Sequence, residues 1–245
     1  MKDTRIIMGM PITVDIQDVL PRQAGLLEEV FAYFTGVDEA FSPYRPDSQV
    51  SRLNRGQLRQ QDYSKELIEV LALAEQTRQE TDGYFDIRRP GGLLDPSGLV
   101  KGWAIRSAAN LLAAAGSQDF FVEAGGDVQA SRPPGAAPWT VGIRNPFAGA
   151  EIIKVLKITS QGVATSGTYE RGQHIYNPHR PGQALDEIAS LTVVGPDVYE
   201  ADRFATAAFA MGRQGIEFIA RRGLEGYQVD RQGKAAFTPG LEKYL

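Results

Sequence analysis

The stretch 93–116 constrains the fold of this chain more than any other segment. A turn of small and polar residues at 95–98 leads into a segment rich in alanine and leucine. This order predicts an arm, a loop of small residues, and then a helix over 102–115. Gly98 and Gly102 carry no Cβ, so a ligand can approach the backbone of this loop closely.

The rest of the chain mixes strands in hairpin order with separate amphipathic helices, which favours an α+β fold. Strands are expected over 5–16, with a bend or bulge at 8–11, and over 120–123, 128–131, 139–144, 152–159, 191–194 and 227–238, the last as a hairpin. Helices are expected over 22–41, 65–81, 102–115, 199–212 and 215–222, with an ordered loop over 41–54 and a long polar interruption over 165–182. The residues expected to be buried in the first helix are Leu26, Leu27, Val30, Phe31, Phe34, Val37 and Phe41. Those expected to be buried in the second helix are Leu67, Ile68, Leu71 and Ala74.

Composition limits the possible functions. The chain has 245 residues, enough for one large domain or for two lobes around a shared cleft. It has no cysteine, which excludes disulfides, thiolate catalysis and zinc–thiolate sites. The formal net charge of −4 gives no general attraction to nucleic acid or to an anionic membrane. No apolar run has the length of a signal peptide or a membrane span, so a cytoplasmic location is expected.

Familiar nucleotide and hydrolase motifs are absent from the sequence. It contains no G-x-x-x-x-G-K-[ST], G-x-G-x-x-G, H-E-x-x-H or G-x-S-x-G pattern. The P-loop, Rossmann, zincin and α/β-hydrolase classes therefore have no support.

Asp202 and Thr206 lie four residues apart on an expected helix, so their oxygens share a face. Such oxygens suit a hard cation such as Mg²⁺, which keeps other positions for water or phosphate. The alternative is structural, because the helix dipole stabilises an aspartate in the first turn and the threonine can face the core. The spacing alone favours the structural alternative.

The two histidines, His174 and His179, both lie in the polar stretch 165–182. Either imidazole can act as a general base, because its ordinary pKa of about 6.5 lies near neutral pH. A histidine beside Asn177 can equally satisfy turn carbonyls. The residues alone slightly favour that structural role.

Other loops leave similar alternatives open. The hydroxyls and glycine at 165–167 suit a phosphate or a sugar, and also any turn. The turn Gly125-Gly126-Asp127 suits a ligand or a simple hairpin. Tyr44 and the aromatic pair at 84–85 can stack on a planar ring or pack into a core. Lys101 can meet a phosphate or remain solvated.

Taken together, these segments resemble the ApbE family of flavin transferases, the FAD:protein FMN transferases. The pieces that carry the resemblance are Met8-Gly9-Met10, FSPYRPDSQVSRLN (41–54), TDGYFD (81–86), DPSGLVKGWA (95–104), AGGD (124–127), ATSGTYERGQHIYNP (164–178) and ADRFATAAFAMG (201–212). They occur in the family's order and cover most of the chain. The resemblance implies one ApbE-like domain over 1–245, with a T-fold-like mixed α+β architecture and a ligand cleft between two lobes.

The resemblance also implies a function, namely Mg²⁺-dependent transfer of FMN from FAD to a Ser or Thr hydroxyl of an acceptor flavoprotein, with release of AMP. The metal would be held by the Gly98 carbonyl, the Asp202 carboxylate and the Thr206 hydroxyl. His174 would deprotonate the acceptor hydroxyl. The residues expected to contact or lie near FAD are Met8, Tyr44, Gly83, Tyr84, Phe85, Asp86, Asp95, Lys101 and Ile175. The alternatives are an FAD pyrophosphatase that releases FMN and AMP, and a non-catalytic FAD-binding module.

The sequence departs from the family pattern at three points. The segment 86–95 is short, which alters one wall of the expected flavin pocket. Asn177 stands where the family usually has an aspartate, which removes a charge near the expected base. The secretion or lipid-anchor signal of many relatives is absent from the first residues, and this argues against an extracytoplasmic acceptor.

Overall fold

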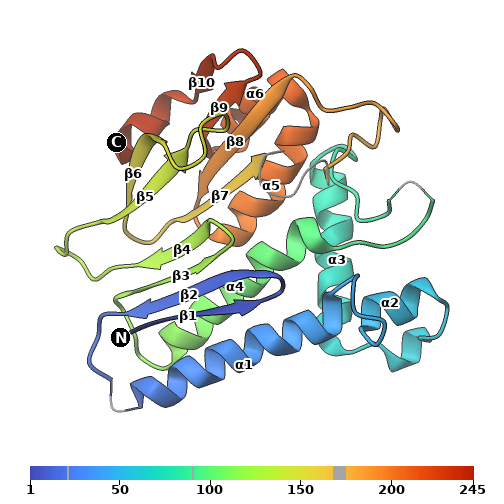
Figure 1. Cartoon of the computed structure of the whole chain (residues 1–245), viewed down its shortest axis with the longest axis horizontal. Helices are drawn as coiled ribbons and strands as arrows, with labels where there is room; N and C mark the ends of the chain where they lie inside the picture. Colours follow the sequence, from blue (N-terminus) through green and yellow to red (C-terminus); the bar gives the residue numbers. More distant parts are fainter. Residues whose placement is uncertain (21, 90, 168–174) are drawn as a thin grey trace.

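A computed structural model of the protein describes residues 1–20, 22–89, 91–167 and 175–245. Within them, helices cover one face of a large antiparallel sheet, and a β-hairpin covers part of the other face (Figure 1). The sheet has eight strands in the order β1-β2-β3-β4-β7-β8-β9-β10, and β5 and β6 form a separate pair. This mixture of sheet and helix confirms the α+β class.

The elements have the following bounds. The strands are β1 (Lys2–Ile7), β2 (Met10–Ile16), β3 (Phe120–Ala124), β4 (Asp127–Ser131), β5 (Trp139–Arg144), β6 (Ile152–Ile158), β7 (Gly162–Gly167), β8 (Ile188–Gly195), β9 (Glu225–Asp230) and β10 (Ala235–Phe237). The helices are α1 (Gln23–Phe41), α2 (Gln49–Asn54), α3 (Lys65–Glu80), α4 (Ser97–Ala114), α5 (Val198–Ala210) and α6 (Gly215–Arg221), with short 3-10 helices η1 (Gln60–Asp62), η2 (Gly212–Gln214) and η3 (Pro239–Tyr244).

Alternating side chains along the strands supply a core on each face of the sheet. On β3, Phe120 and Val122 share an apolar cluster with α1, α3 and α4. On the adjacent strand β4, Val128 points to the opposite face and shares a cluster with Leu156 of β6. A further cluster joins α5 and α6 to β7 and β8 on the helix-covered face. The two halves of the sheet therefore carry different helices, and the contact between α4 and α5 lies where these halves meet.

The periodic helices agree with the sequence predictions, with one exception in α3. All the apolar residues expected to be buried in α1 are buried. In α3, Leu67 and Ala74 are buried as expected, but Ile68 is 54% exposed, and Val70 and Thr77 take the remaining inward positions. The prediction for Ile68 was wrong because α3 presents a narrow stripe to its neighbours. The Ser64 hydroxyl caps α3 by accepting the Leu67 N–H.

Two predictions near the start of the chain need correction. The expected strand 5–16 is a hairpin of β1 and β2, because Met8 and Gly9 both have positive φ angles (56° and 71°) and reverse the chain. The expected loop 41–54 is a turn region followed by helix α2, whose first turn is capped by the Ser48 hydroxyl. Six helical residues are too few to show a periodic pattern.

Two further corrections concern the segments around the expected site. Helix α4 begins at Ser97, so Gly98, Lys101 and Gly102 lie in its first turns and not in a loop. The residues 165–167, assigned to a polar interruption, form the end of β7, which the sequence analysis missed. This strand lies between β4 and β8, and its polar residues and two terminal glycines hide the usual strand pattern.

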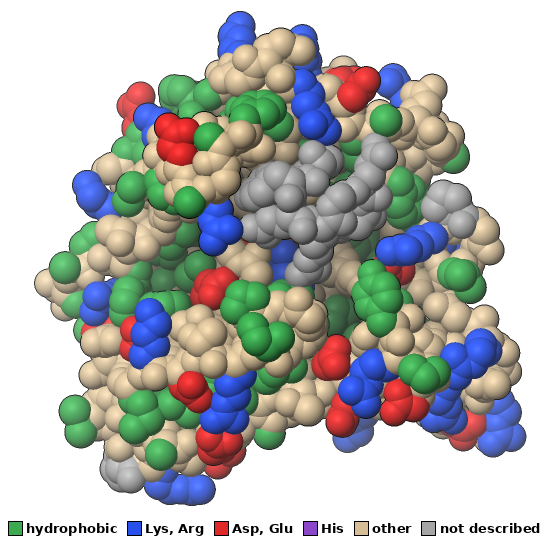
Figure 2. All heavy atoms as spheres, viewed as in Figure 1, with side chains coloured by type: hydrophobic (Ala, Val, Ile, Leu, Met, Phe, Trp, Pro, Cys, Tyr) green, Lys and Arg blue, Asp and Glu red, His purple; other side chains and the backbone are tan. Residues whose placement is uncertain are grey.

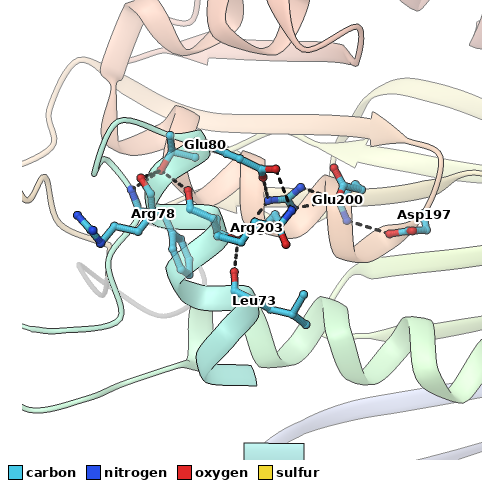
Figure 3. A network of polar contacts seen from close by, with 10 residues as sticks. Leu73, Arg78, Glu80, Asp197, Glu200 and Arg203 are labelled. Carbon is cyan, nitrogen blue, oxygen red and sulfur yellow. Dashed lines mark hydrogen bonds and ion pairs between the residues drawn. The ribbon is translucent and has the colours of Figure 1, made fainter. Parts of the chain in front are cut away.

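A buried ionic network ties α3 to α5 (Figure 3). The Arg203 guanidinium on α5 pairs with Glu80 on α3 and, at 2.6 Å, with Glu200 on its own helix. It also donates to the Thr77 hydroxyl at 3.2 Å. Burial alone raises the pKa of Glu80, but hydrogen bonds from Gln76 and Arg203 lower this pKa overall. The network fixes the end of α3, which leads directly into the turn 81–86.

No helix in the described ranges has the length and apolar character needed to span a bilayer.

Candidate active site

A cleft of about 560 Å³ opens where the two halves of the sheet and their helices meet. Segments far apart in the sequence form its walls: the β1–β2 turn, the α1–α2 loop, the turn 81–86, the start of α4, the end of β7, and α5. The lining residues are Met8, Gly9, Asp38, Ser42, Tyr44, Tyr84, Phe85, Asp86, Arg89, Asp95, Ser97, Gly98, Lys101, Gly125, Thr165, Ser166, Gly167, Ile175, Tyr176, Asp202 and Thr206. All described candidate residues except Gly83 are in this set. His174 lies outside the described residues.

Charged side chains of both signs are scattered over the described surface seen in Figure 2, without a large patch of either sign. An anionic ligand in the cleft therefore depends on local groups for neutralisation.

The three expected metal-binding groups come together on the facing helices α4 and α5. The Thr206 hydroxyl lies 3.5 Å from the Gly98 carbonyl oxygen. Asp202 is one helical turn earlier on α5 and is only 3% exposed. One of its carboxylate oxygens accepts the Gly102 N–H at 2.8 Å, a donor that a regular helix directs at the Gly98 carbonyl. A carbonyl, a carboxylate and a hydroxyl oxygen are a ligand set that fits Mg²⁺.

Gly102 lets these helices approach closely. A Cβ at this position would lie 2.7 Å from the Asp202 Cβ and 2.9 Å from the Val198 carbonyl oxygen. Gly98 has looser surroundings, because a Cβ there would meet the Thr206 methyl group at 3.3 Å. The glycines of this segment thus serve helix packing as well as access to the backbone.

Among the described residues, no three Asp, Glu or His side chains gather in a cluster that could hold a metal ion. The expected metal-binding set contains one carboxylate, that of Asp202. Such a set leaves coordination positions for water or ligand phosphates, as is usual for Mg²⁺.

Lys101 brings positive charge to the same place. Its ammonium lies 2.6 Å from Asp127 Oδ2 and 3.6 Å from Asp202 Oδ1. The Lys101 side chain is 15% exposed, so it reaches the cleft while its partners stay buried. The expected contact of Lys101 with FAD phosphates is compatible with this position.

Asp95 also lines the cleft and accepts the Ser97 N–H at 3.1 Å, at the start of α4. Asp95 also forms an ion pair with Arg89. The Tyr176 hydroxyl donates to the Asp86 carbonyl at 2.8 Å. Burial, assisted by the negative charge of Asp86, raises the pKa of Tyr176 to about 12, so its phenol stays neutral at physiological pH.

Aromatic residues differ in how they border the cleft. Tyr44 is 88% exposed at its mouth, whereas Phe85 is 3% exposed and packs beside Gly98. Tyr84 contacts the His179 ring, with centroids 4.5 Å apart, and His179 Nε2 lies 2.8 Å from the Asp82 carbonyl. Gly83, with a φ of 78°, sits against His179 and shapes the turn without lining the cleft. The structural role considered for His179 is therefore the one that the geometry supports.

The sequence analysis missed several groups of the site. Asp127 was left between a ligand contact and a hairpin turn, and its pairing with Lys101 was not predicted. Ser166 was left between a ligand contact and a turn, and its hydroxyl lies 3.5 Å from the Thr206 hydroxyl. Arg89 was not singled out in the sequence, and Tyr176 was noted only as part of the motif 164–178. The carboxylate directly after two glycines in AGGD was the available clue for Asp127.

The fold and the cleft define an α+β protein with a ligand site between two halves of an antiparallel sheet. This architecture matches solved flavin transferase structures. The structure titled flavin transferase ApbE from Vibrio cholerae superposes with a TM-score of 0.84 at 20% identity, covering 100% of this chain and 99% of that one. The ApbE protein of Thermotoga maritima gives a TM-score of 0.86 at 21% identity, covering 100% and 98%.

The sequence comparisons identify the family. The ApbE family profile matches residues 8–89 and 87–228. The chain therefore belongs to the ApbE family, as the motifs predicted. A curated FAD:protein FMN transferase of Klebsiella pneumoniae is 33% identical over 143 residues, which are 54% of this chain and 43% of that protein. One from Escherichia coli is 26% identical over 189 residues, which are 71% of this chain and 53% of that protein. The chain thus spans about half the length of these curated relatives.

Proposed function

We propose that this protein is a FAD:protein FMN transferase that moves FMN from FAD to a Ser or Thr hydroxyl of an acceptor flavoprotein and releases AMP. The observation that carries the proposal is the convergence of Gly98, Asp202 and Thr206 with Lys101 in one cleft. Family membership and the names of the curated relatives support the same activity.

In this proposal, the Gly98 carbonyl, the Asp202 carboxylate and the Thr206 hydroxyl would hold Mg²⁺, which would supply positive charge to neutralise the pyrophosphate of FAD. The Lys101 ammonium adds a second positive charge toward the phosphates. Tyr44 and Tyr84 offer aromatic surface to the planar rings of the ligand. Met8, Asp86, Asp95 and Ile175 complete the proposed FAD contacts, with Gly83 and Phe85 shaping the wall between them.

The reaction forms a bond between the acceptor oxygen and the FMN-side phosphorus and breaks the bond from that phosphorus to the AMP phosphate oxygen. The acceptor hydroxyl has to lose its proton as this bond forms, and we assign that step to His174. The product is a seryl or threonyl flavin joined by a phosphoester. Asn177 is linked to the end of α5, because its amide donates to the Ala210 carbonyl at 3.1 Å.

We further propose that residues 1–245 act as one domain, since the cleft takes its lining from residues between Met8 and Thr206. A cytoplasmic location stays a prediction from the sequence, which fractionation of the source cells tests.

The test of the function is incubation of the purified protein with FAD, Mg²⁺ and candidate acceptor flavoproteins encoded near its gene. A covalent fluorescent acceptor band with an equal amount of AMP is the expected result. AMP and FMN without a band would replace the proposal with an FAD pyrophosphatase. Bound, intact FAD without either product would leave a non-catalytic FAD-binding module.

A further inference from the structure

Asp127 is a buried carboxylate that supports the cleft without lining it. It is 1% exposed and begins β4 directly after the Gly125–Gly126 turn. Its Oδ1 accepts the Thr165 N–H of the neighbouring strand β7 at 3.0 Å, and its Oδ2 pairs with the Lys101 ammonium at 2.6 Å. One oxygen therefore anchors the carboxylate to the sheet, and the other holds the lysine.

Of the two carboxylates that pair with the Lys101 ammonium among the described residues, Asp127 is closer than Asp202, at 2.6 Å against 3.6 Å. A lysine side chain has a long, flexible stem, so its position depends on the partner that binds it most strongly. Without the charge of Asp127, the nearest remaining carboxylate is that of Asp202. The ammonium would then move onto Asp202, which is the proposed metal ligand, and away from the ligand phosphates.

We propose that Asp127 is a positioning residue that keeps the Lys101 ammonium from moving onto Asp202 and directs it at the phosphates of FAD. Asp127 acts through Lys101 and touches no ligand itself. This inference rests on the proposed function, since it takes the cleft to hold FAD. It also explains why a carboxylate, which by its charge repels a pyrophosphate, is buried next to an anion site.

The direction in which one substitution changes FAD affinity distinguishes this positioning role from a simple charge effect. Removing a negative charge near an anionic ligand strengthens the binding of that ligand if charge alone matters. Removing the group that positions Lys101 weakens the binding. Asp127→Asn is suitable, because its amide oxygen can still accept the Thr165 N–H and the side chain keeps its size.

The experiment measures FAD affinity by quenching of flavin fluorescence, at saturating Mg²⁺, for the native protein, Asp127→Asn, Lys101→Met and the double variant. We expect Asp127→Asn to weaken FAD binding about tenfold in the native background, the effect of one charged hydrogen bond. In the Lys101→Met background, where no ammonium needs a position, the same change is expected to leave FAD binding equal or tighter.

Circular dichroism and thermal unfolding show whether each variant folds. If Asp127→Asn does not fold, Asp127→Ser serves in its place, since its hydroxyl also offers an oxygen to the Thr165 N–H. Equal or tighter FAD binding by the single variant overturns the inference, and so does an equal weakening in both backgrounds. A native protein that binds FAD but transfers no FMN would contradict the proposed function alone, and the titration would still decide the role of Asp127. A native protein that binds no FAD would overturn both.

Discussion

Replacing Arg203 with methionine tests whether the network between α3 and α5 holds the two sides of the cleft together. Methionine keeps the apolar stem but removes the charge that Glu80 and Glu200 share. Removing one partner of a buried ion pair costs about 3–5 kcal/mol. The Arg203 side chain is 4% exposed, but those of Glu80 and Glu200 are 28% and 27% exposed, so water can partly solvate the unpaired carboxylates. We therefore expect a loss of about 2–3 kcal/mol in the free energy of unfolding.

Urea unfolding at pH 7 measures this loss, and Arg78→Met is the matched control. Arg78 pairs with Glu75 on the exposed side of α3, where water screens an ion pair and its loss should change stability little. The pKa of Glu80 is lowered in the folded state, so its contribution is present above the ordinary value of 4.5 and is lost as the pH falls through the folded value. The gap between native and Arg203→Met protein should narrow below about pH 4.5. A loss at pH 7 no larger than that of Arg78→Met would refute the reasoning.

Three further substitutions test the site. Gly102→Ala places a Cβ 2.7 Å from the Asp202 Cβ, so thermal unfolding should show a loss of about 1–3 kcal/mol, whereas Gly36→Ala, with no atom within 4 Å, should be neutral or stabilising. Asp202→Ala should weaken both FMN transfer and Mn²⁺ binding, the latter measured by the electron paramagnetic resonance signal of free Mn²⁺. If the variant binds Mn²⁺ as tightly as the native protein, Asp202 is not a metal ligand. His174→Ala should abolish FMN transfer but retain FAD binding by fluorescence quenching, and unchanged turnover would exclude His174 as the base.

The sequence predicted those parts of the fold that follow from local periodicity. In α1, a regular apolar stripe from Leu26 to Phe41 was sufficient to identify both the helix and its buried face. The pattern failed for β7, because its hydroxyls bond to other hydroxyls instead of apolar side chains packing into a core. Thr165 pairs with Thr192 of β8, and Ser166 pairs with Thr206 of α5. It also failed at the start of α4, where Gly98 and Gly102 are tolerated in a helix because α5 packs closely against them.

Residue spacing in the sequence could not predict which groups form the site. Gly98 and Thr206 are 108 residues apart in the sequence, and nothing local indicates that their oxygens lie 3.5 Å apart. The family resemblance supplied these residues, and the described structure brings them into one cleft. Asp127 was not recognised, because its importance arises from a contact with Lys101 that forms only in the folded protein.

Diffraction from crystals grown with FAD and Mn²⁺ tests the central claim most directly, because the anomalous signal of Mn²⁺ locates the metal independently of any assumed chemistry. We expect an anomalous peak within bonding distance of the Gly98 carbonyl, the Asp202 carboxylate and the Thr206 hydroxyl. The pyrophosphate of FAD should lie next to both this metal ion and the Lys101 ammonium. A metal peak at another place, or FAD bound outside this cleft, would contradict the central claim.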